Sequence, residues 1–341
     1  MSNLTVFVGL DYHKDSVQVC IMDARGTILL NRACPNDAGV VARLVAGHGA
    51  RVRAAIEACT GAAALADELI ARFGWDLDLA HPGYVHRLKQ SPDKSDFTDA
   101  RMLADLVRVG YLPRVWLAPE AVRQLRILVR YRQQLVDERR ATKLRVTALL
   151  RDARVAEPPP RRWGRGWLAW LPRAEGLGPE ARFVVGRHLE HLRRLDAEVR
   201  AVEARLAAVT RDDPVVARLV QQPGIGPVTA WVLRAEVGRF DRFRTGKQLA
   251  RYCGVTPRNA SSGQRQADAG LVKAGSDLLR ATLVEAAHRL VRCDPRWRAL
   301  AATLRAGGKP ACVVAAAVAN RFARWLYHQV EGGPPALRAV G

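Results

Sequence analysis

Four acidic residues constrain this chain more than any other feature, because each lies at an edge of a predicted strand or helix. They are Asp11, Glu57, Asp96 and Asp99. Asp11 ends an apolar, strand-like run, and Glu57 ends a second one. A carboxylate at the end of a buried strand costs free energy unless another group compensates its charge. Four carboxylates that converge form the oxygen-rich ligand set that Mg²⁺, a hard cation, prefers.

Such a ligand set predicts two Mg²⁺ ions and a nucleic-acid substrate, because two ions can clamp the attacking and leaving oxygens of a phosphodiester. The net charge of +21 also indicates a polyanionic partner, with nucleic acid first and an anionic membrane second. Residues 1–117 hold 13 Lys and Arg against 13 Asp and Glu, so the whole excess lies in residues 118–341. An Arg-rich proteome would inflate the charge, but it would not leave the first third neutral.

Alternating strand and helix patterns over residues 1–117 predict an α/β domain. The expected strands are 5–10, 16–23, 26–31, 52–57 and 76–80, and the expected helices are 37–46, 61–73 and 99–109. This order predicts a mixed sheet covered by helices in the layout of ribonuclease H, with Asp11 and Glu57 on neighbouring strands. Asp96 and Asp99 are three residues apart and can share one helix face near an N-terminus, whose dipole favours carboxylates.

Residues 118–212 predict a helical insert. Long helices are expected over 119–152 and 179–209, and the second has apolar residues at alternating steps of three and four. That spacing is typical of a coiled-coil seam. The two helices could form an antiparallel hairpin or pair with another subunit, and the sequence leaves this open. Three Trp residues in the connector could stack on unpaired bases, but a cap on the hairpin explains them better. They are Trp163, Trp167 and Trp170.

Residues 213–331 predict a mainly helical C-terminal domain, and residues 332–341 a flexible tail. Its expected helices are 228–237, 245–252, 275–291 and 310–330. The turn that contains Gly224 and Gly226 resembles the hairpin of a helix-hairpin-helix module, in which backbone N–H groups face a phosphate. A plain glycine-rich turn between helices is equally compatible with this pattern.

A loop of small and basic residues at 254–265 forms a second constellation. The loop contains Arg258, Ser261, Ser262 and Arg265, and two further basic residues, Lys273 and Arg280, follow it. Such a loop suits a phosphate backbone, and a serine there could simply donate a hydrogen bond. Ser262 could also be a nucleophile, which requires activation by a metal, a base or a cation. No His or carboxylate lies at a fixed spacing nearby, so the metals of the first domain would have to activate it.

The cysteines, the N-terminal residues and the apolar stretches indicate the cellular compartment. The six cysteines show no CxxC spacing, which predicts neither a disulfide framework nor a zinc site. The chain enters a strand without a basic leader, and its longest apolar stretch, residues 311–319, is too short to cross a bilayer. We therefore expect a soluble cytoplasmic protein.

Several short motifs occur in a fixed order over nearly the whole chain. They are Gly9-Leu10-Asp11, Ile56-Glu57-Ala58-Cys59-Thr60-Gly61, Lys94-Ser95-Asp96-Phe97-Thr98-Asp99-Ala100-Arg101, Pro223-Gly224-Ile225-Gly226, Gly254-Val255-Thr256-Pro257-Arg258, Ser262-Gly263, Lys273-Ala274-Gly275 and Leu279-Arg280. Each is weak alone, whereas the ordered set is highly specific. In this set the chain resembles the DEDD transposases, which are insertion-sequence recombinases related to the pilin-gene invertases.

The resemblance implies a RuvC-like N-terminal domain that holds Mg²⁺ on the four acidic residues, and a bacterial, nucleoid-associated protein. It also implies a C-terminal transposase domain whose catalytic serine maps onto Ser262, with Ser261 an adjacent alternative. DNA would be the substrate, both at the element ends and at the target, and strand exchange would pass through a phosphoserine in a homo-oligomer, a dimer or a tetramer, with composite sites. Several members use a non-coding bridge RNA, so the resemblance implies such a partner here.

Other functions fit parts of the pattern. Sugar-kinase and actin-like ATPases also begin with a strand, a Gly and an Asp, but the chain lacks their glycine-rich phosphate loops. A junction resolvase would keep the nuclease fold and use metal-activated water in place of serine. A non-catalytic nucleic-acid-binding protein is disfavoured because all four acidic residues are present. Tyr12 and His13 are expected to be wall residues, with His13 at most near a metal-bound water.

Overall fold

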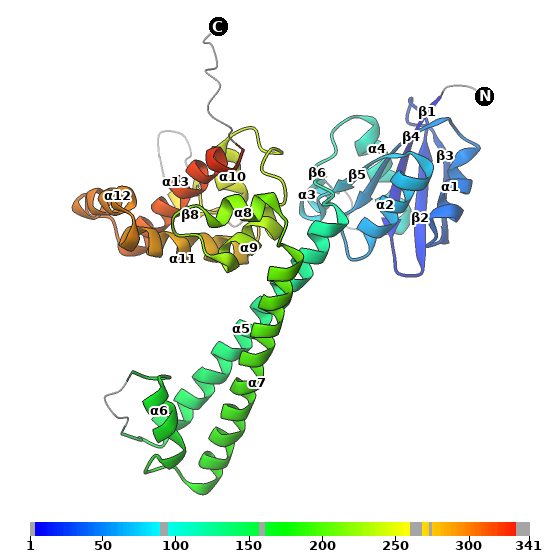
Figure 1. Cartoon of the computed structure of the whole chain (residues 1–341). Coiled ribbons are helices and arrows are strands. Elements are labelled where there is room, and N and C mark those ends of the chain that lie inside the picture. The colour runs from blue at the N-terminus through cyan, green and yellow to red at the C-terminus, as the bar shows by residue number, and fades with distance from the viewer. Residues whose placement is uncertain (1–3, 89–94, 157–160, 260–267, 273–274, 332–341) are drawn as a thin grey trace. The chain divides into compact units, whose positions relative to one another are not determined.

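The chain folds into two compact units, Met1–Ala118 and Pro119–Gly341 (Figure 1). The computed structural model describes residues 4–88, 95–156, 161–259, 268–272 and 275–331. The first unit is a mixed α/β domain, and the second is almost entirely helical. These two classes are those that the sequence predicts for its first third and for the remainder.

A six-stranded mixed sheet forms the centre of the first unit, in the order β3-β2-β1-β4-β5-β6. Its strands are β1 (Thr5–Tyr12), β2 (Ser16–Met22), β3 (Ile28–Pro35), β4 (Arg51–Glu57), β5 (Asp76–Ala80) and β6 (Arg114–Val115). The neighbours β1, β4 and β5 are parallel, and the other pairs are antiparallel. The predicted mixed sheet is therefore confirmed, and its strand order is compatible with a ribonuclease-H-like layout.

Helices cover both faces of this sheet. They are α1 (Ala38–Ala46), α2 (Ala62–Phe73), α3 (Pro82–Leu88) and α4 (Asp96–Arg108). Helices α1 and α2 pack on the face that carries Val8 and Leu10, whereas α3 and α4 pack on the opposite face with Ala55. Because side chains alternate along a strand, β1 presents Gly9 and Asp11 to the α4 side.

Two of these elements, α4 and β3, have an end that differs from the predicted bound by three residues or more. Helix α4 begins at Asp96, three residues before the predicted start, because the Ser95 hydroxyl accepts a hydrogen bond from the Thr98 amide and caps it. Strand β3 continues to Pro35 because it pairs with β2 along its whole length, although most of its side chains are exposed. Helix α3 and strand β6 were not predicted.

Gly9 lets α4 approach the sheet closely. A Cβ atom at this position would lie 1.9 Å from the Ala100 carbonyl oxygen and 2.5 Å from the Ala104 amide nitrogen. We expect Gly9→Ala to lower the free energy of unfolding by about 1–3 kcal/mol, because backbone atoms of α4 must move away. Urea denaturation measures this change.

Gly47→Ala is the matched control for that substitution. Gly47 ends α1 with an ordinary helical φ of −75°, and a Cβ atom there would meet nothing within 4 Å. We expect this variant to stay within about 0.5 kcal/mol of the parent. Equal urea midpoints for the two variants would contradict the close packing of α4 on Gly9.

Two long helices, α5 (Glu120–Asp152) and α7 (Pro179–Val209), form an antiparallel hairpin in the second unit (Figure 1). Their direction follows from ion pairs between them, Arg132 with Glu203 at 2.7 Å and Arg139 with Asp196 at 2.8 Å. Of the two arrangements that the sequence leaves open, the structure therefore has the hairpin within one chain.

The predicted tryptophan cap on this hairpin is confirmed. Helix α6 (Arg165–Trp170) and a short 3₁₀ turn, Leu171–Arg173, lie between the long helices. Trp167 is fully buried in a cluster that also contains Val146 of α5 and Val185 of α7. Its ring centroid lies 4.7 Å from that of Trp163 and 5.9 Å from that of Trp170.

Shorter elements build the rest of the second unit. They are α8 (Pro214–Val220), α9 (Pro227–Val237), α10 (Gly246–Tyr252), β7 (Pro257–Asn259), β8 (Asp268–Leu271), α11 (Asp277–Cys293), α12 (Pro295–Ala306) and α13 (Ala311–Glu331). The four predicted helices correspond to α9, α10, α11 and α13, whereas α8, α12 and the β7–β8 pair were not predicted. Among the helices that the structure describes, none is long and apolar enough to cross a membrane.

An ion pair between the exposed Arg130 and the buried Glu236 joins the hairpin to this part of the unit. Glu236 of α9 is 3% exposed and accepts hydrogen bonds from Nε and Nη2 of Arg130 at 2.9 and 3.1 Å. Arg126, one turn earlier on α5, donates to the Ala235 carbonyl at 2.7 Å. A bidentate contact of this kind fixes the orientation of the two side chains as well as their distance. The base of the hairpin is therefore held in a defined direction on α9.

Candidate metal centre

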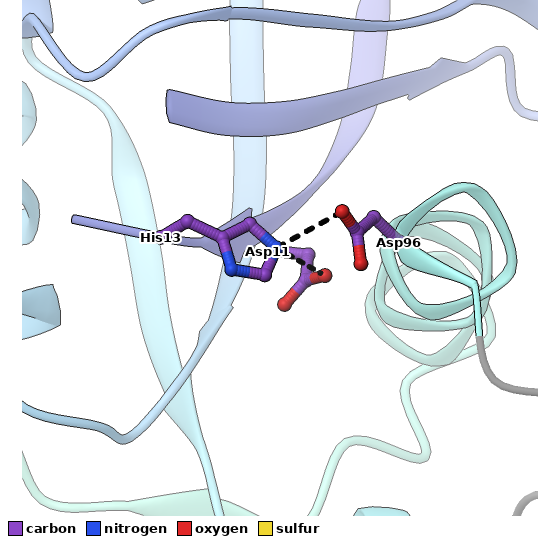
Figure 2. A group of neighbouring side chains, drawn as sticks. All are labelled: Asp11, His13 and Asp96. Carbon is purple, nitrogen blue, oxygen red and sulfur yellow. Dashed lines mark ion pairs between the residues drawn. The ribbon is translucent and has the colours of Figure 1, made fainter. Parts of the chain in front are cut away.

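Three side chains gather at the end of β1 and the start of α4. Figure 2 shows the His13 ring nitrogen Nε2 between two carboxylates, 3.3 Å from Asp11 Oδ2 and 3.2 Å from Asp96 Oδ2. One ligand atom from each of the three residues lies within 4.8 Å of the others. The Asp11 side chain is 17% exposed, whereas those of His13 and Asp96 are about half exposed. The cluster therefore has a buried floor and an open side.

Local sequence explains how these residues meet. Asp11 lies on the α4 face of β1, and His13 follows two residues later, just beyond the strand. Ser95 starts α4 directly before Asp96, and the Asn31 side-chain amide of β3 donates to the Phe97 carbonyl at 3.0 Å. These two contacts hold the first turn of α4 against the sheet. The close packing of α4 on β1 then brings Asp96 to Asp11.

Glu57 belongs to the same edge of the sheet. The parallel register of β1 and β4 pairs Leu10 with Ile56, so Asp11 and Glu57 each stand one residue beyond that pair. Neighbouring strands lie about 4.8 Å apart. The predicted placement of these two acidic residues on adjacent strand ends is therefore what the structure shows, although Glu57 is not one of the three clustered residues.

Asp99 lies deeper, one helical turn after Asp96, and is 9% exposed. It is also outside the group of three. The structure thus brings Asp11 and Asp96 into direct proximity through His13, and it places Glu57 and Asp99 around them.

The electrostatics of Asp11 reflect this crowding. Burial raises the pKa of the Asp11 carboxyl above its ordinary value, and His13 opposes the change. The negative charges of Asp99, Asp96 and Glu57, in that order, raise the pKa of Asp11 further. The ionised form of Asp11 is therefore less favourable than that of an ordinary Asp, and a bound divalent cation would offset this cost.

The donor atoms fit a divalent cation. Asp11 and Asp96 supply the carboxylate oxygens that Mg²⁺ prefers, whereas an imidazole nitrogen is a ligand more typical of transition metals. His13 Nε2 lies between the two carboxylates, within hydrogen-bonding distance of an oxygen of each. The two acidic residues are thus suited to bind an ion directly, with His13 beside it.

The observed position of His13 differs from the predicted one. A wall position was expected, but the imidazole contacts both carboxylates. The signal was present, because residues two apart at a strand end point to the same side. Tyr12 packs against the cluster of Val8 and Leu10, on the face of β1 opposite Asp11, and its hydroxyl oxygen would lie 2.1 Å from a Cβ atom on Gly61 in the turn after β4.

The candidate nucleic-acid residues of the second unit have different surroundings. Gly224, with a φ of +75°, and Gly226, at the start of α9, form the turn between α8 and α9. Arg258 is exposed on β7, whereas Arg280 is engaged in an ion pair with Asp277 of its own helix. The predicted residues Ser261, Ser262, Arg265 and Lys273 lie outside the described residues.

The fold and the acidic cluster define an α/β protein with a candidate metal centre at the edge of its sheet, joined to a helical unit. Residues 8–154 match a family model described as a transposase, and residues 216–302 match one described as the transposase IS116/IS110/IS902 family. The first match includes the whole cluster. The second includes helices α9, α10 and α11.

Relatives extend over most of the chain. A probable family 20 transposase of Pseudomonas aeruginosa is 32% identical over 80% of this chain and 82% of its own length. The transposase for insertion sequence element IS1111A of Coxiella burnetii is 28% identical, over 84% of this chain and 78% of the relative. The transposase for IS1328 of Yersinia enterocolitica is 26% identical over 84% of both chains. The chain belongs to this family of insertion-sequence transposases.

Proposed function

We propose that this chain is the transposase of an insertion sequence, an enzyme that cuts and rejoins DNA at the element ends and at the target. The observation that carries the proposal is the cluster of Asp11, His13 and Asp96 at a sheet edge, within a chain whose relatives are transposases. We further propose that the first unit has a RuvC-like, ribonuclease-H-like fold. The strand order and the acidic residues at adjacent strand ends support it.

We propose Asp11, Glu57, Asp96 and Asp99 as the ligands of two Mg²⁺ ions. Bound there, the ions would polarise a phosphodiester and lower the barrier to nucleophilic attack. Asp11, whose side chain is 17% exposed, would fix the site on the sheet, and the half-exposed Asp96 would leave it open to a substrate. His13 would then lie within reach of the phosphate or of a bound water.

Ser262 is the proposed nucleophile. Its Oγ would form a bond to phosphorus while the bond from phosphorus to the leaving strand oxygen breaks, and the hydroxyl proton would leave with a base or solvent. The phosphoserine ester keeps the bond energy, so a second strand can attack it and release the serine without ATP. Residues 254–265 would hold the strand through basic side chains and small residues, with the phosphate contacts predicted above.

The finer assignments complete the proposal. The active site would be composite in a homo-oligomer, with the acidic residues from one subunit and Ser262 from another, and the α5–α7 hairpin would act as its coiled-coil segment. A bridge RNA paired with donor and target DNA would provide sequence specificity, and the basic second unit would hold the backbones. The excess of 41 Lys and Arg over 20 Asp and Glu in residues 118–341 supports this part.

Metal binding tests the site directly. We expect 10 mM Mg²⁺ to stabilise the protein by about 1.4 kcal/mol if the dissociation constant is about 1 mM, measured as a thermal shift. The pKa of Asp11 is raised, so a proton competes with the ion for this carboxylate. The apparent affinity for Mg²⁺ should therefore rise with pH up to the point at which Asp11 is fully ionised. Strand exchange should stop in EDTA.

Asp96→Asn and Asp15→Asn form a matched pair for this measurement. Asp15 is exposed and lies beside the site in sequence, but it is not one of the clustered residues. We expect Asp15→Asn to retain the Mg²⁺-dependent shift and Asp96→Asn to lose most of it. An equal shift in both variants would place the ion elsewhere and contradict the proposed ligands.

A further inference from the structure

A hollow lined by basic and aromatic side chains lies between α12 and α13. Its volume is about 500 Å³. Its lining includes Arg296 and Trp297 of α12 and, from α13, Arg321, Arg324, Trp325 and His328. The two helices pack against each other here through aromatic side chains. The ring centroid of Trp297 lies 5.6 Å from that of Phe322 and 6.3 Å from that of Trp325. The floor of the hollow is therefore a packed aromatic layer.

The charge of this hollow is of one sign. No Asp or Glu lines it, and none of the three arginine side chains forms an ion pair with a carboxylate among the described residues. A larger hollow, of about 750 Å³ between α5, α9 and α11, shows the contrast, because three acidic residues lie there beside Arg132 and Arg289. They are Asp137, Asp277 and Glu285. The lining at α12–α13 is thus purely basic in its charged groups, unlike that of the larger hollow.

One of the three arginines, Arg296, is held in place without a ligand. The Arg296 guanidinium lies over the ring of Trp297 at 4.9 Å and over that of Trp325 at 5.7 Å. Cation–π contacts of this kind hold the group in place. Arg321, Arg324 and His328 follow at steps of three and four along α13, so they share one face of the helix. Because Arg296 is already held on the two rings, its contact with a ligand costs less conformational entropy.

We propose that this hollow binds the phosphodiester backbone of a nucleic acid. Guanidinium groups donate planar pairs of hydrogen bonds that match phosphate oxygens. A row of exposed arginines on one helix face, with a third held on an indole beside it, matches consecutive phosphates better than it matches a single small anion. The proposal rests on the proposed function only in its choice of nucleic acid as the partner, because nothing in the hollow depends on the metal centre.

The test uses the full chain and the double variant Arg321→Ala/Arg324→Ala. Binding to a fluorescent 20-nucleotide RNA and to a 20-base-pair DNA duplex is measured in EDTA at several salt concentrations. Each phosphate contact contributes about 0.7 to 0.9 to the slope of log affinity against log salt. Losing two contacts should therefore lower that slope by about 1.4 to 1.8 and weaken binding about 10- to 50-fold at 0.1 M salt.

Arg193→Ala/Arg194→Ala is the matched control, because it removes the same charge from exposed positions on another helix, α7. We expect it to change the slope little. A loss confined to RNA or to DNA identifies which backbone the hollow holds. The proposal is overturned if the two double variants bind both nucleic acids equally well. It is also overturned if Arg321→Ala/Arg324→Ala weakens binding of poly-glutamate alone, since the partner would then be an acidic protein.

Because EDTA removes the metal, this measurement is independent of the catalytic assignment. An inactive metal centre leaves the expected change in salt slope unaltered. Conversely, an unchanged slope would remove the α12–α13 site and leave the thermal response to Mg²⁺ as it was. The two proposals therefore fail separately.

Discussion

Asp11→Asn is expected to lower strand exchange by about 100- to 1000-fold, because a metal ligand contributes several kcal/mol of transition-state stabilisation. The substitution keeps the size of the side chain and removes its charge. Labelled element ends and a target, followed on a gel, measure the activity. Asp15→Asn, with the same chemical change at an exposed position, should retain activity within about twofold.

The same variant should be more stable than the parent when metal is absent. The folded-state pKa of Asp11 is raised above its unfolded value, mainly by burial. A carboxyl of this kind favours folding most below its unfolded pKa, and this contribution disappears as the pH rises through the folded pKa. At neutral pH the ionised Asp11 therefore weakens the metal-free fold, and the neutral amide removes that cost. We expect a higher melting temperature for Asp11→Asn in EDTA.

Mg²⁺ should reverse this order of stability. Mg²⁺ should stabilise the parent more than Asp11→Asn, because the variant lacks one ligand of the ion. The difference in melting temperature between the two proteins should therefore shrink or change sign. Thermal scans of both proteins with and without Mg²⁺ test this. A variant that is less stable than the parent in EDTA, or that still exchanges strands, would contradict the role assigned to Asp11.

Ser262→Ala is expected to abolish both strand exchange and the covalent protein–DNA adduct. Removal of a nucleophilic oxygen leaves no atom to form the ester, so the loss should approach the detection limit, as with other covalent catalysts. Denaturing gels of labelled DNA display the adduct as a band of reduced mobility.

Ser261→Ala is the neighbouring control and should keep the adduct. A reversed result, with the adduct lost only in Ser261→Ala, would move the nucleophile by one residue. Continued cutting by Ser262→Ala without any adduct would favour a resolvase-type enzyme that uses metal-activated water. That outcome would refute the serine mechanism while leaving the acidic cluster in place.

Much of the first unit could be predicted from the sequence because its strands are short apolar runs between clear turns. The placement of Asp11 and Glu57 at the ends of adjacent strands followed from the order of these elements. The spacing of His13 and Asp11 places them on one side of the strand end, but the contact of His13 with Asp96 could not be predicted. It depends on how closely α4 packs on β1, and Gly9 determines that distance through the absence of a side chain.

The misplaced boundaries have similar physical causes. Helix α4 begins at Asp96 because of a single capping hydroxyl, a signal that competes weakly with the apolar pattern further along. Strand β3 lies at the edge of the sheet, and its exposed side chains leave no alternation to detect. Helix α12 did carry a start signal, since Asp294 caps it and Pro295 is its first residue.

In the second unit, the sequence pattern predicts the long helices but not how they pair. Heptad spacing in α7 predicts a helix that needs a partner, but it does not specify which one. Ion pairs such as Arg132–Glu203 decide that the partner is α5 of the same chain. These pairs depend on the relative register of two helices far apart in sequence, which no local pattern contains.

The antiparallel course of the hairpin has a consequence for how such proteins can vary. The chain leaves along α5 and returns along α7, so both ends of the excursion meet at the base, where Arg130 and Glu236 fix its direction. Removing or adding the same number of whole turns from both helices would change the reach of the arm without disturbing that base. The length of the hairpin could thus vary between relatives without a change in the residues at the sheet edge.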